Sequence, residues 1–388
     1  MKIGIDKLGF YTSDYYVDMA KLAKARHEDP NKYLIGIGQS KMAVIPPTQD
    51  VVTMAANAAE QILTPTDKEE IDLVLFATES GIDNSKAAAI YVADLLGLKK
   101  EIRALELKQA CYAATGAIQL AKGYLALNPT KKVLVFGADI SRYGLKTGGE
   151  PTQGGGAVAI LMSCEPRLLA LEDEAALYVE NIMDFWRPLG KTEALVDGKF
   201  SATAYMDFCQ KVSADYLAKT KLTLTDFAAL LFHLPYTKMG LKSLRLLLEN
   251  SSAQDAERLL EQFEVARLYN RQVGNLYTGS LYLSLLSLLD NSQTLKANDR
   301  IGMFSYGSGA QGEFFTAIVQ PEYQKYLQSA KMQALLAQRQ ELSVAQYEAM
   351  FAAGILNGPN QTLDISQDKA TYVLSGIKDW QRQYEIQK

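Results

Sequence analysis

Apolar residues along the chain gather in short runs that alternate with longer amphipathic segments. Residues 71–77, 132–138, 227–232 and 300–305 are almost wholly apolar, which is typical of strands covered on both faces. Between them lie segments whose apolar residues recur every three or four positions, and this spacing predicts helices. Strands that alternate with helices predict a layered α/β architecture.

The pattern of the first half of the chain recurs in the second half. Phe76 corresponds to Phe232 at an offset of 156 residues, and Phe136 corresponds to Phe304 at an offset of 168. Similar offsets between similar segments indicate an internal duplication, so we expect two structural halves that follow the same plan.

The boundary between the halves is predicted at Glu165–Pro166, which gives units of residues 1–165 and 166–388. The polar tail, residues 322–388, is predicted to be helical and appended to the second half. Residues 15–26 carry apolar residues at helical spacing and predict a helix near the N-terminus.

Charge and cysteine usage narrow the class of protein. The 388 residues carry a formal net charge of −4, which argues against non-specific binding to nucleic acid. The N-terminal stretch has no apolar signal-peptide core, and no apolar run approaches 18 residues, so we expect no membrane span. The three cysteines have no paired or metal-type spacing. These features together predict a cytoplasmic protein.

The stretch LELKQACYAATGAIQLAKG, residues 105–123, predicts a strand, a sharp turn and a helix that opens at or next to Cys111. The N-terminus of a helix carries free N–H groups and a partial positive charge, which would lower the pKa of the thiol. Cys111 is therefore a candidate nucleophile. From this stretch alone a buried structural cysteine is the favoured interpretation.

Two further candidates stand where apolar strands end. Glu79 follows the run 71–77, and enclosure there would raise the pKa of its carboxyl group toward that of a usable base. His233, one of two histidines, follows the run 227–232 and could act as a general acid or as an oxyanion partner. Each residue alone could instead be structural. Ligands bind at the carboxyl ends of strands in α/β folds, so packing of the two halves would bring Glu79, Cys111 and His233 together.

Two other motifs allow both a functional and a structural interpretation. Residues 307–312, GSGAQG, match GxGxxG, but strand-like residues follow instead of a helix, so we expect a tight turn whose N–H groups face an oxyanion. Lys238 and Lys242 lie one helical turn apart. They either clamp the phosphates of a large anionic ligand or form a solvated face.

Several separate stretches share their residues, order and spacing with one enzyme family. From near residue 1 to about residue 355, the chain resembles the 3-hydroxy-3-methylglutaryl-CoA (HMG-CoA) synthases in their short bacterial form. The matching stretches are DPNKYLIGIGQSKMAV, ATES, LELKQACYAATGAIQLAKG, DISRYGLKTGGEPTQGGGAVAIL, DFWRP, VDGKFS, FHLPYTKMG, RQVGNLYTGSLY and FSYGSGAQGEF. The resemblance implies a homodimeric thiolase fold, with two similar βαβαβαββ halves in a five-layered αβαβα arrangement.

The resemblance also implies roles for individual residues. Cys111 would carry an acetyl group, Glu79 would be the general base and acid, and His233 would assist the second substrate. Tyr143 and Asp184 match the family with less definite roles. The positions that contact substrate or coenzyme A in relatives match Asp29, Lys32, Thr152, Ser201, Lys238, Lys242, Asn275 and Ser308. One departure is visible: the family usually has glycine after Cys-Tyr, whereas this chain has Ala113 and Ala114, which bears on turnover rate.

The implied reaction condenses acetyl-CoA with acetoacetyl-CoA and water to HMG-CoA and CoA, in the mevalonate pathway of isoprenoid biosynthesis. The acetyl group would pass through Cys111, and neither a metal nor a redox cofactor would be needed. We expect the attack of Cys111 to proceed without help from a distant carboxylate. We expect carbon–carbon bond formation to need Glu79.

Three alternatives stay open at this stage. The first is another thiolase-fold condensing enzyme, such as a ketoacyl synthase III, although the carboxylate base at Glu79 favours an HMG-CoA synthase. The second is a β-branching synthase of polyketide assembly that acts on a carrier-protein-bound chain. The third is a scaffold that binds CoA without turnover, but all three candidate catalytic residues are present.

Overall fold

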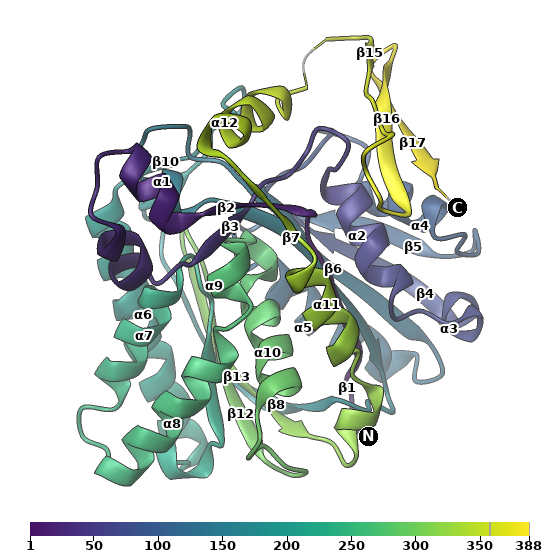
Figure 1. Ribbon diagram of the computed structural model, residues 1–388. Helices are drawn as coiled ribbons and strands as arrows, with labels where there is room; N and C mark the ends of the chain where they lie inside the picture. Colours follow the sequence, from purple (N-terminus) through teal and green to yellow (C-terminus); the bar gives the residue numbers. More distant parts are fainter. Residues whose placement is uncertain (357, 388) are drawn as a thin grey trace.

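The computed structural model describes residues 1–356 and 358–387. Within that range the main sheet has nine strands (Figure 1). In spatial order they are β5 (Arg103–Leu107), β4 (Ile71–Ala77), β6 (Lys132–Ser141), β7 (Gly154–Ser163), β1 (Gly4–Tyr11), β8 (Leu169–Val179), β13 (Gln311–Val319), β12 (Arg300–Gly307) and β11 (Ala229–Phe232).

The two ends of this sheet repeat one topology. In the first half β4 runs parallel to β5 and β6, and β6 then pairs antiparallel with β7. In the second half β11 runs parallel to β12, which pairs antiparallel with β13. The two parts join where Gly4 and Ile5 of β1 pair with Ala170 and Leu169 of β8. The topology agrees with the duplication, while the exact boundary at residues 165 and 166 stays a prediction.

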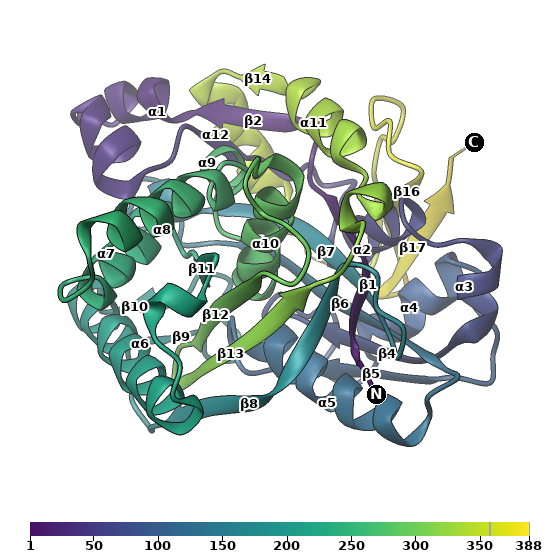
Figure 2. The same ribbon diagram turned by 90° about the horizontal axis from the view of Figure 1, so that it is seen from below.

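Helices separate and cover the two parts of the sheet, which gives the five expected layers (Figure 2). The central layer contains α5 (Ala113–Leu127) and α10 (Ser280–Asn291). On the outside of the first half lie α2 (Val51–Glu60) and α4 (Ala88–Leu95), and on the outside of the second half lie α6 (Gly198–Thr220) and α7 (Thr237–Leu247). The remaining helices include α3 (Pro65–Glu70), α8 (Ala253–Ala266) and α9 (Asn270–Val273).

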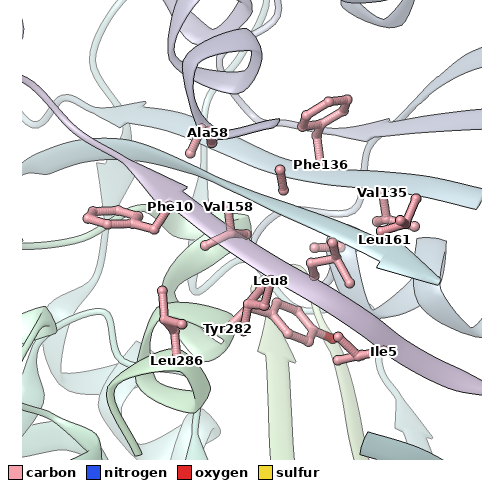
Figure 3. Packing of buried hydrophobic residues seen from close by; sticks show 14 of the residues in the cluster. Ile5, Leu8, Phe10, Ala58, Val135, Phe136, Val158, Leu161, Tyr282 and Leu286 are labelled. Atoms are coloured by element: carbon pink, nitrogen blue, oxygen red, sulfur yellow. The ribbon is translucent and has the colours of Figure 1, made fainter. Parts of the chain in front are cut away.

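The packing of the core explains why the strands of the main sheet are continuous apolar runs in the sequence. Figure 3 shows side chains of β1, β6 and β7 between Ala58 of α2 on one side and Tyr282 and Leu286 of α10 on the other. Since both faces of the sheet are covered, alternation between apolar and polar residues is lost. The small residues of α2 let that helix approach the sheet closely, and nine of its ten residues are buried.

The prediction of a helix over residues 15–26 is only half right. A short strand, β2 (Tyr15–Asp18), comes first and pairs with β3 (Lys41–Ala43). Helix α1 (Met19–Ala25) begins after Asp18, whose carboxylate accepts a hydrogen bond from the Lys21 backbone N–H. Pairing with a strand distant in sequence thus overrides the local helical spacing of the first four residues.

The prediction of a helical tail is also partly wrong. The tail contains α11 (Ser329–Ala337) and α12 (Val344–Ala353), but β14 (Gln340–Leu342) between them pairs with β2. Three more strands, β15 (Gln361–Thr362), β16 (Tyr372–Lys378) and β17 (Gln381–Ile386), form a separate sheet. Buried residues of β16 pack on α2, and this contact is invisible in the polar composition of the tail. The last short pair is β9 (Phe185–Trp186) with β10 (Leu195–Val196). Among the described residues, no helix is long and apolar enough to cross a bilayer.

The buried carboxylate of Asp67 connects α3 to the main sheet. It accepts hydrogen bonds from Lys7 of β1 at 2.5 Å and from Lys132 of β6 at 2.7 Å. Burial alone would raise the pKa of Asp67, but the bonds from Lys132 and Lys7 hold it well below its usual range. Asp67→Asn leaves these lysines without their shared counter-charge, so we expect a loss of about 3 kcal/mol in the free energy of unfolding at pH 7.

The stability lost in Asp67→Asn should depend on pH with a defined sign. Because the folded-state pKa is lowered, the stabilisation is present above the usual aspartate pKa and is lost as the pH falls below it. The difference between urea titrations of wild type and variant should therefore shrink progressively as the pH falls from about 4 to about 2. Asp94→Asn, which breaks an exposed pair with Lys100, is the control and should change little at any pH. A constant difference down to about pH 2 would contradict this account.

Candidate active site

Cys111 lies in the turn between β5 and α5. Ala110 makes the turn with φ of 43°, and α5 begins two residues after Cys111, as the sequence predicted. The end of β12 packs directly on this turn, because a Cβ atom on Gly307 would lie only 2.5 Å from the Gln109 carbonyl oxygen. The Tyr112 hydroxyl donates a 2.6 Å hydrogen bond to Glu313 of β13, which anchors the turn to the second half.

Glu79 contacts Cys111 directly. The thiol of Cys111 donates a hydrogen bond to Glu79 Oε1 with a distance of 3.1 Å between Sγ and Oε1. Burial, together with the negative charge of Asp139, raises the pKa of Glu79 above its ordinary value. A carboxylate with a raised pKa next to a thiol is a base suited to work near neutral pH.

The pKa of Cys111 moves opposite to the sequence-based expectation. Burial raises the pKa of the thiol, and the charge of Glu79 raises it further. The expectation of a lowered pKa considered only the end of α5, but loss of water and a like-charged neighbour act in the opposite direction. Glu79 and Cys111 meet as the strand-end placement predicted, because β4 and β5 are adjacent, and the carboxylate is therefore not distant from the attacking thiol as the sequence analysis also assumed.

Asp139, near the end of β6, holds Glu79 in place and was not singled out by the sequence analysis. Its Oδ1 atom accepts from the backbone N–H of Glu79 at 2.7 Å, from that of Ser80 at 3.0 Å and from the Thr78 hydroxyl at 2.9 Å. Its Oδ2 atom accepts from the hydroxyl of Thr278 at 2.6 Å and from its N–H at 3.1 Å. An aspartate near the end of a fully apolar strand was the signal that could have revealed it.

Asn275 reaches the site from the second half of the chain. Its Nδ2 atom lies 3.5 Å from the hydroxyl of Tyr143, and its Oδ1 atom accepts from the Tyr277 N–H at 2.8 Å. The loop that carries Asn275 can approach β6 because a Cβ atom on Gly279 would lie 2.8 Å from the Gly137 carbonyl oxygen. Burial raises the pKa of Tyr143, and the nearby Cys111 adds to this effect, so the phenol stays protonated.

His233 lies at the end of β11, as predicted, but makes no hydrogen bond to Cys111 or Glu79. Its backbone N–H donates to the Phe304 carbonyl at 2.8 Å, and its carbonyl accepts from the Tyr205 hydroxyl at 2.5 Å. Burial lowers the pKa of the imidazole to about 3, so His233 is neutral at physiological pH. Its Nδ1 atom is buried and has no hydrogen-bond partner among the residues that the structure describes.

The turn between β12 and β13 is the tight turn predicted for residues 307–312, and a strand follows it. Asp184 accepts from the N–H of Gly309 at 2.9 Å, from the Tyr306 hydroxyl at 2.9 Å and from Ser201 at 3.2 Å. Ser308 precedes Gly309 in this turn. Ser308 and Glu79 line the same cavity, which has a volume of about 1150 Å³.

Three further residues predicted to contact the substrate, Lys32, Lys238 and Lys242, lie on η1 and α7. The π-helical turn η1 (Lys32–Ile37) packs against α7, where the Thr237 hydroxyl donates to the Gly38 carbonyl at 2.6 Å. Lys238 is partly buried and Lys242 is exposed, and neither forms an ion pair within the described part of the chain. Lys32 pairs with Glu28 at 2.7 Å and lines a cavity of about 470 Å³.

Two other predicted contact residues make local hydrogen bonds. Asp29 is exposed and accepts from the Asn31 N–H at 2.9 Å. The Thr152 hydroxyl donates to the Gly149 carbonyl at 2.8 Å. Within residues 1–356 and 358–387, no three histidine, cysteine, aspartate or glutamate side chains group in a way that could hold a metal ion.

Protein-family comparison identifies both halves of the chain. The family described as hydroxymethylglutaryl-coenzyme A synthase N terminal matches residues 1–166, and its C-terminal counterpart matches residues 169–267 and 256–386. The hydroxymethylglutaryl-CoA synthase of Enterococcus faecalis is 51% identical over 384 residues, which cover 99% of this chain and 100% of that relative. The polyketide biosynthesis 3-hydroxy-3-methylglutaryl-ACP synthase PksG of Bacillus subtilis is 30% identical and covers 98% of each chain.

Solved structures agree with the sequence comparison. An HMG-CoA synthase crystallised with CoA matches with a TM-score of 0.96 and 42% identity over the full length of both chains. MvaS in complex with 3-hydroxy-3-methylglutaryl coenzyme A matches with a TM-score of 0.89 and 33% identity, over 100% of this chain and 99% of that one. With its five-layered fold of the thiolase type, the chain belongs to the hydroxymethylglutaryl-CoA synthase family.

Proposed function

We propose that this chain condenses acetyl-CoA with acetoacetyl-CoA and water to form HMG-CoA and CoA, with Cys111 as acetyl carrier and Glu79 as the proton-transfer group. The observation that carries the assignment of residues is the 3.1 Å contact between Cys111 Sγ and Glu79 Oε1. Family membership supplies the reaction class, an acyl transfer that belongs to the mevalonate pathway.

The first half-reaction transfers the acetyl group to the enzyme. Glu79 takes the thiol proton of Cys111 as the sulfur attacks the thioester carbonyl of acetyl-CoA. The C–S bond to CoA breaks, and the proton on Glu79 passes to the departing sulfur. The raised pKa of Glu79 suits both transfers, since the group can hold the proton briefly and then release it.

The second half-reaction forms the carbon–carbon bond. Glu79, again a carboxylate, removes a proton from the methyl group of acetyl-Cys111, and the resulting carbanion attacks the ketone carbon of acetoacetyl-CoA. The same proton returns to the new alkoxide. Water then cleaves the bond to Cys111, which releases HMG-CoA and restores the thiol.

Donors around the site are suited to the charges that develop on oxygen. Neutral His233 and the amide of Asn275 can donate hydrogen bonds without adding a competing positive charge. In the turn between β12 and β13 the N–H groups of Gly309 and Ala310 already donate to Asp184 and to the Glu180 carbonyl, so the Ser308 N–H is the group proposed to face a thioester oxyanion. Tyr143 is protonated and close enough to Cys111 for the thiol to affect its pKa, and it is proposed to donate to the bound acyl group.

Coenzyme A is proposed to lie along the surface formed by η1, α7 and the loop that carries Thr152. Lys238, Lys242 and Lys32 supply positive charge for its phosphates, and Asp29 is available for its polar groups. The binding roles of Tyr143, Asp184, Ser201 and Asn275 belong to the same proposal. The proposed substrates are CoA thioesters. The proposed reaction uses neither a metal nor a redox cofactor.

A carrier-protein-bound substrate is the second candidate, because PksG and the curacin synthase crystallised with donor-ACP align over 98% or more of this chain. Higher identity to the Enterococcus relative favours free CoA thioesters. Assays of acetoacetyl-CoA against an acetoacetyl carrier protein separate the two.

We further propose a cytoplasmic homodimer. Strand β5 lies at the edge of the main sheet with one neighbour, β4, and Leu105 on it is 57% exposed. An uncovered edge strand with apolar side chains favours pairing with a second copy. The three cysteines, all free, agree with a reducing compartment.

The role of Cys111 predicts the outcome of acetyl labelling. Incubation with radiolabelled acetyl-CoA should add one acetyl group per chain, and Cys111→Ala or Cys111→Ser should abolish stable labelling because the thioester cannot form. Cys164→Ser and Cys209→Ala are matched controls that should keep the label. Label that persists in Cys111→Ala and maps to Cys164 or Cys209 would refute the assignment.

The role of Glu79 predicts that its loss separates the half-reactions. Glu79→Ala removes a proton acceptor from Cys111 but also a charge that raises the thiol pKa, so acetylation should slow only modestly. Condensation loses its positioned base and should fall by about 10²-fold to 10⁴-fold. Acetyl labelling and HMG-CoA formation measure the two steps. Glu79→Gln, which keeps the shape, should behave in the same way. Condensation at a near wild-type rate would assign the base to another residue.

The lysines on α7 predict a change in substrate affinity. Lys238→Ala with Lys242→Ala should raise the KM for acetyl-CoA about tenfold or more, with a smaller effect on kcat, because charge-assisted contacts to phosphates are lost. Lys219→Ala, which breaks a pair with Asp215 on the helix α6, is the control and should leave KM unchanged. An unchanged KM in the double variant would mean that these lysines are a solvated face.

A further inference from the structure

The side chain of Gln153 connects three parts of the chain at the start of β7. Its Oε1 atom accepts hydrogen bonds from the backbone N–H groups of Tyr143 at 2.7 Å and Gly144 at 3.1 Å. Its Nε2 atom donates to the Tyr347 hydroxyl of α12 at 2.9 Å. The Gln153 carbonyl also accepts from the Asn275 N–H at 3.3 Å. One residue thus touches the main chain of two proposed substrate contacts and a helix of the C-terminal tail.

Helix α12 is held firmly enough to serve as an anchor. Figure 1 shows it beside α1 and β2, although these segments are more than 300 residues apart in sequence. The guanidinium of Arg142 donates to the carbonyls of Phe351 and Gly354 at 3.1 Å each, and Arg26 pairs with Glu348 at 2.7 Å. Tyr347 itself is 2% exposed.

The position of Tyr143 depends on a main-chain restraint. Its ring meets Phe185 and Tyr277 edge to face, with centroids 6.0 Å and 6.2 Å apart, and such contacts tolerate sliding of the ring. Its hydroxyl lies 3.5 Å from the Nδ2 atom of Asn275. The short bond from the Tyr143 N–H to Gln153 therefore adds a restraint on the main chain that carries the phenol.

An amide suits this position better than other side chains. It offers an acceptor for two N–H groups and a donor for the tyrosine hydroxyl without burying a charge. An apolar side chain would leave two N–H groups without partners, and a carboxylate would place a second negative charge near buried Glu150.

We propose that Gln153 is a positioning residue for the condensation reaction and that Tyr347 acts through it, so that the C-terminal tail forms part of the support of the active site. This inference rests on the proposed function, because it takes Tyr143 as a group beside the acyl-enzyme. Tyr347 touches no substrate. Its hydroxyl holds the Gln153 amide, and the amide holds the Tyr143 main chain.

The test compares Gln153→Ala, Tyr347→Phe and the double variant in the full-length enzyme. Radiolabelled acetyl incorporated at saturation counts the competent sites, and kcat is expressed per site. We expect kcat per site to fall about tenfold or more in Gln153→Ala and about threefold in Tyr347→Phe. The KM for acetyl-CoA should change less than about twofold, because the phosphate-binding lysines are untouched. Since Tyr347 acts through Gln153, the double variant should equal Gln153→Ala.

Tyr216→Phe is the matched control. It also removes a buried tyrosine hydroxyl, which pairs with Thr316 at 2.7 Å, but it lies away from Tyr143. Its kcat per site should equal that of wild type even where its melting temperature falls. Wild-type-like kcat per site in Gln153→Ala and Tyr347→Phe, or independent losses that multiply in the double variant, would overturn the inference. If Gln153→Ala does not fold, the comparison of Tyr347→Phe with Tyr216→Phe decides alone. Failure of the wild type to acetylate or to condense would instead refute the proposed function.

Discussion

The hydrogen bonds to the buried carboxylate of Asp139 hold the candidate active site together. This carboxylate is fully buried near the end of β6 and accepts six hydrogen bonds, from Thr78, Glu79 and Ser80 of the first half and from Thr278 of the second. A buried carboxylate is costly unless its oxygens are satisfied, so these donors must stay in place for the fold to be stable. The same requirement fixes the backbone of Glu79 and docks the loop before α10.

This arrangement links stability to chemistry. The charge that organises the loops also lies close enough to Glu79 to raise the pKa of its carboxyl group, and Glu79 in turn raises the pKa of Cys111. The thiol proton lies in the hydrogen bond between Cys111 and Glu79, and the imidazole of His233 is neutral. In the proposed reaction, direct proton transfer between Cys111 and Glu79 avoids a free thiolate in a water-poor site.

Much of the fold and of the candidate site could be predicted from local residue patterns. Strand β4 occupies the segment expected for it, β6 and β12 begin at the expected residues, and the turn after β12 leads into a strand as predicted. Cys111 and Glu79 meet because both follow strands that are neighbours in the sheet. The prediction of a helical tail was the main failure, because a polar hairpin that packs on one helix and a polar helix have similar compositions. Asp139 was overlooked because its donors are scattered from residue 78 to residue 278.

The layered architecture, the duplication and the candidate nucleophile could all be inferred from the chain alone, because covered strands require apolar runs and Cys111 follows a strand-to-helix pattern in the sequence. The protonation state of these groups and their surroundings depend on how distant segments pack together. The pKa of Cys111 is raised rather than lowered, Glu79 lies within hydrogen-bonding distance of it, and Tyr143 is held through Gln153 by a helix of the tail. Each of these outcomes depends on desolvation and on charges brought from distant segments, which act over a few ångströms in space and leave no local pattern in the chain.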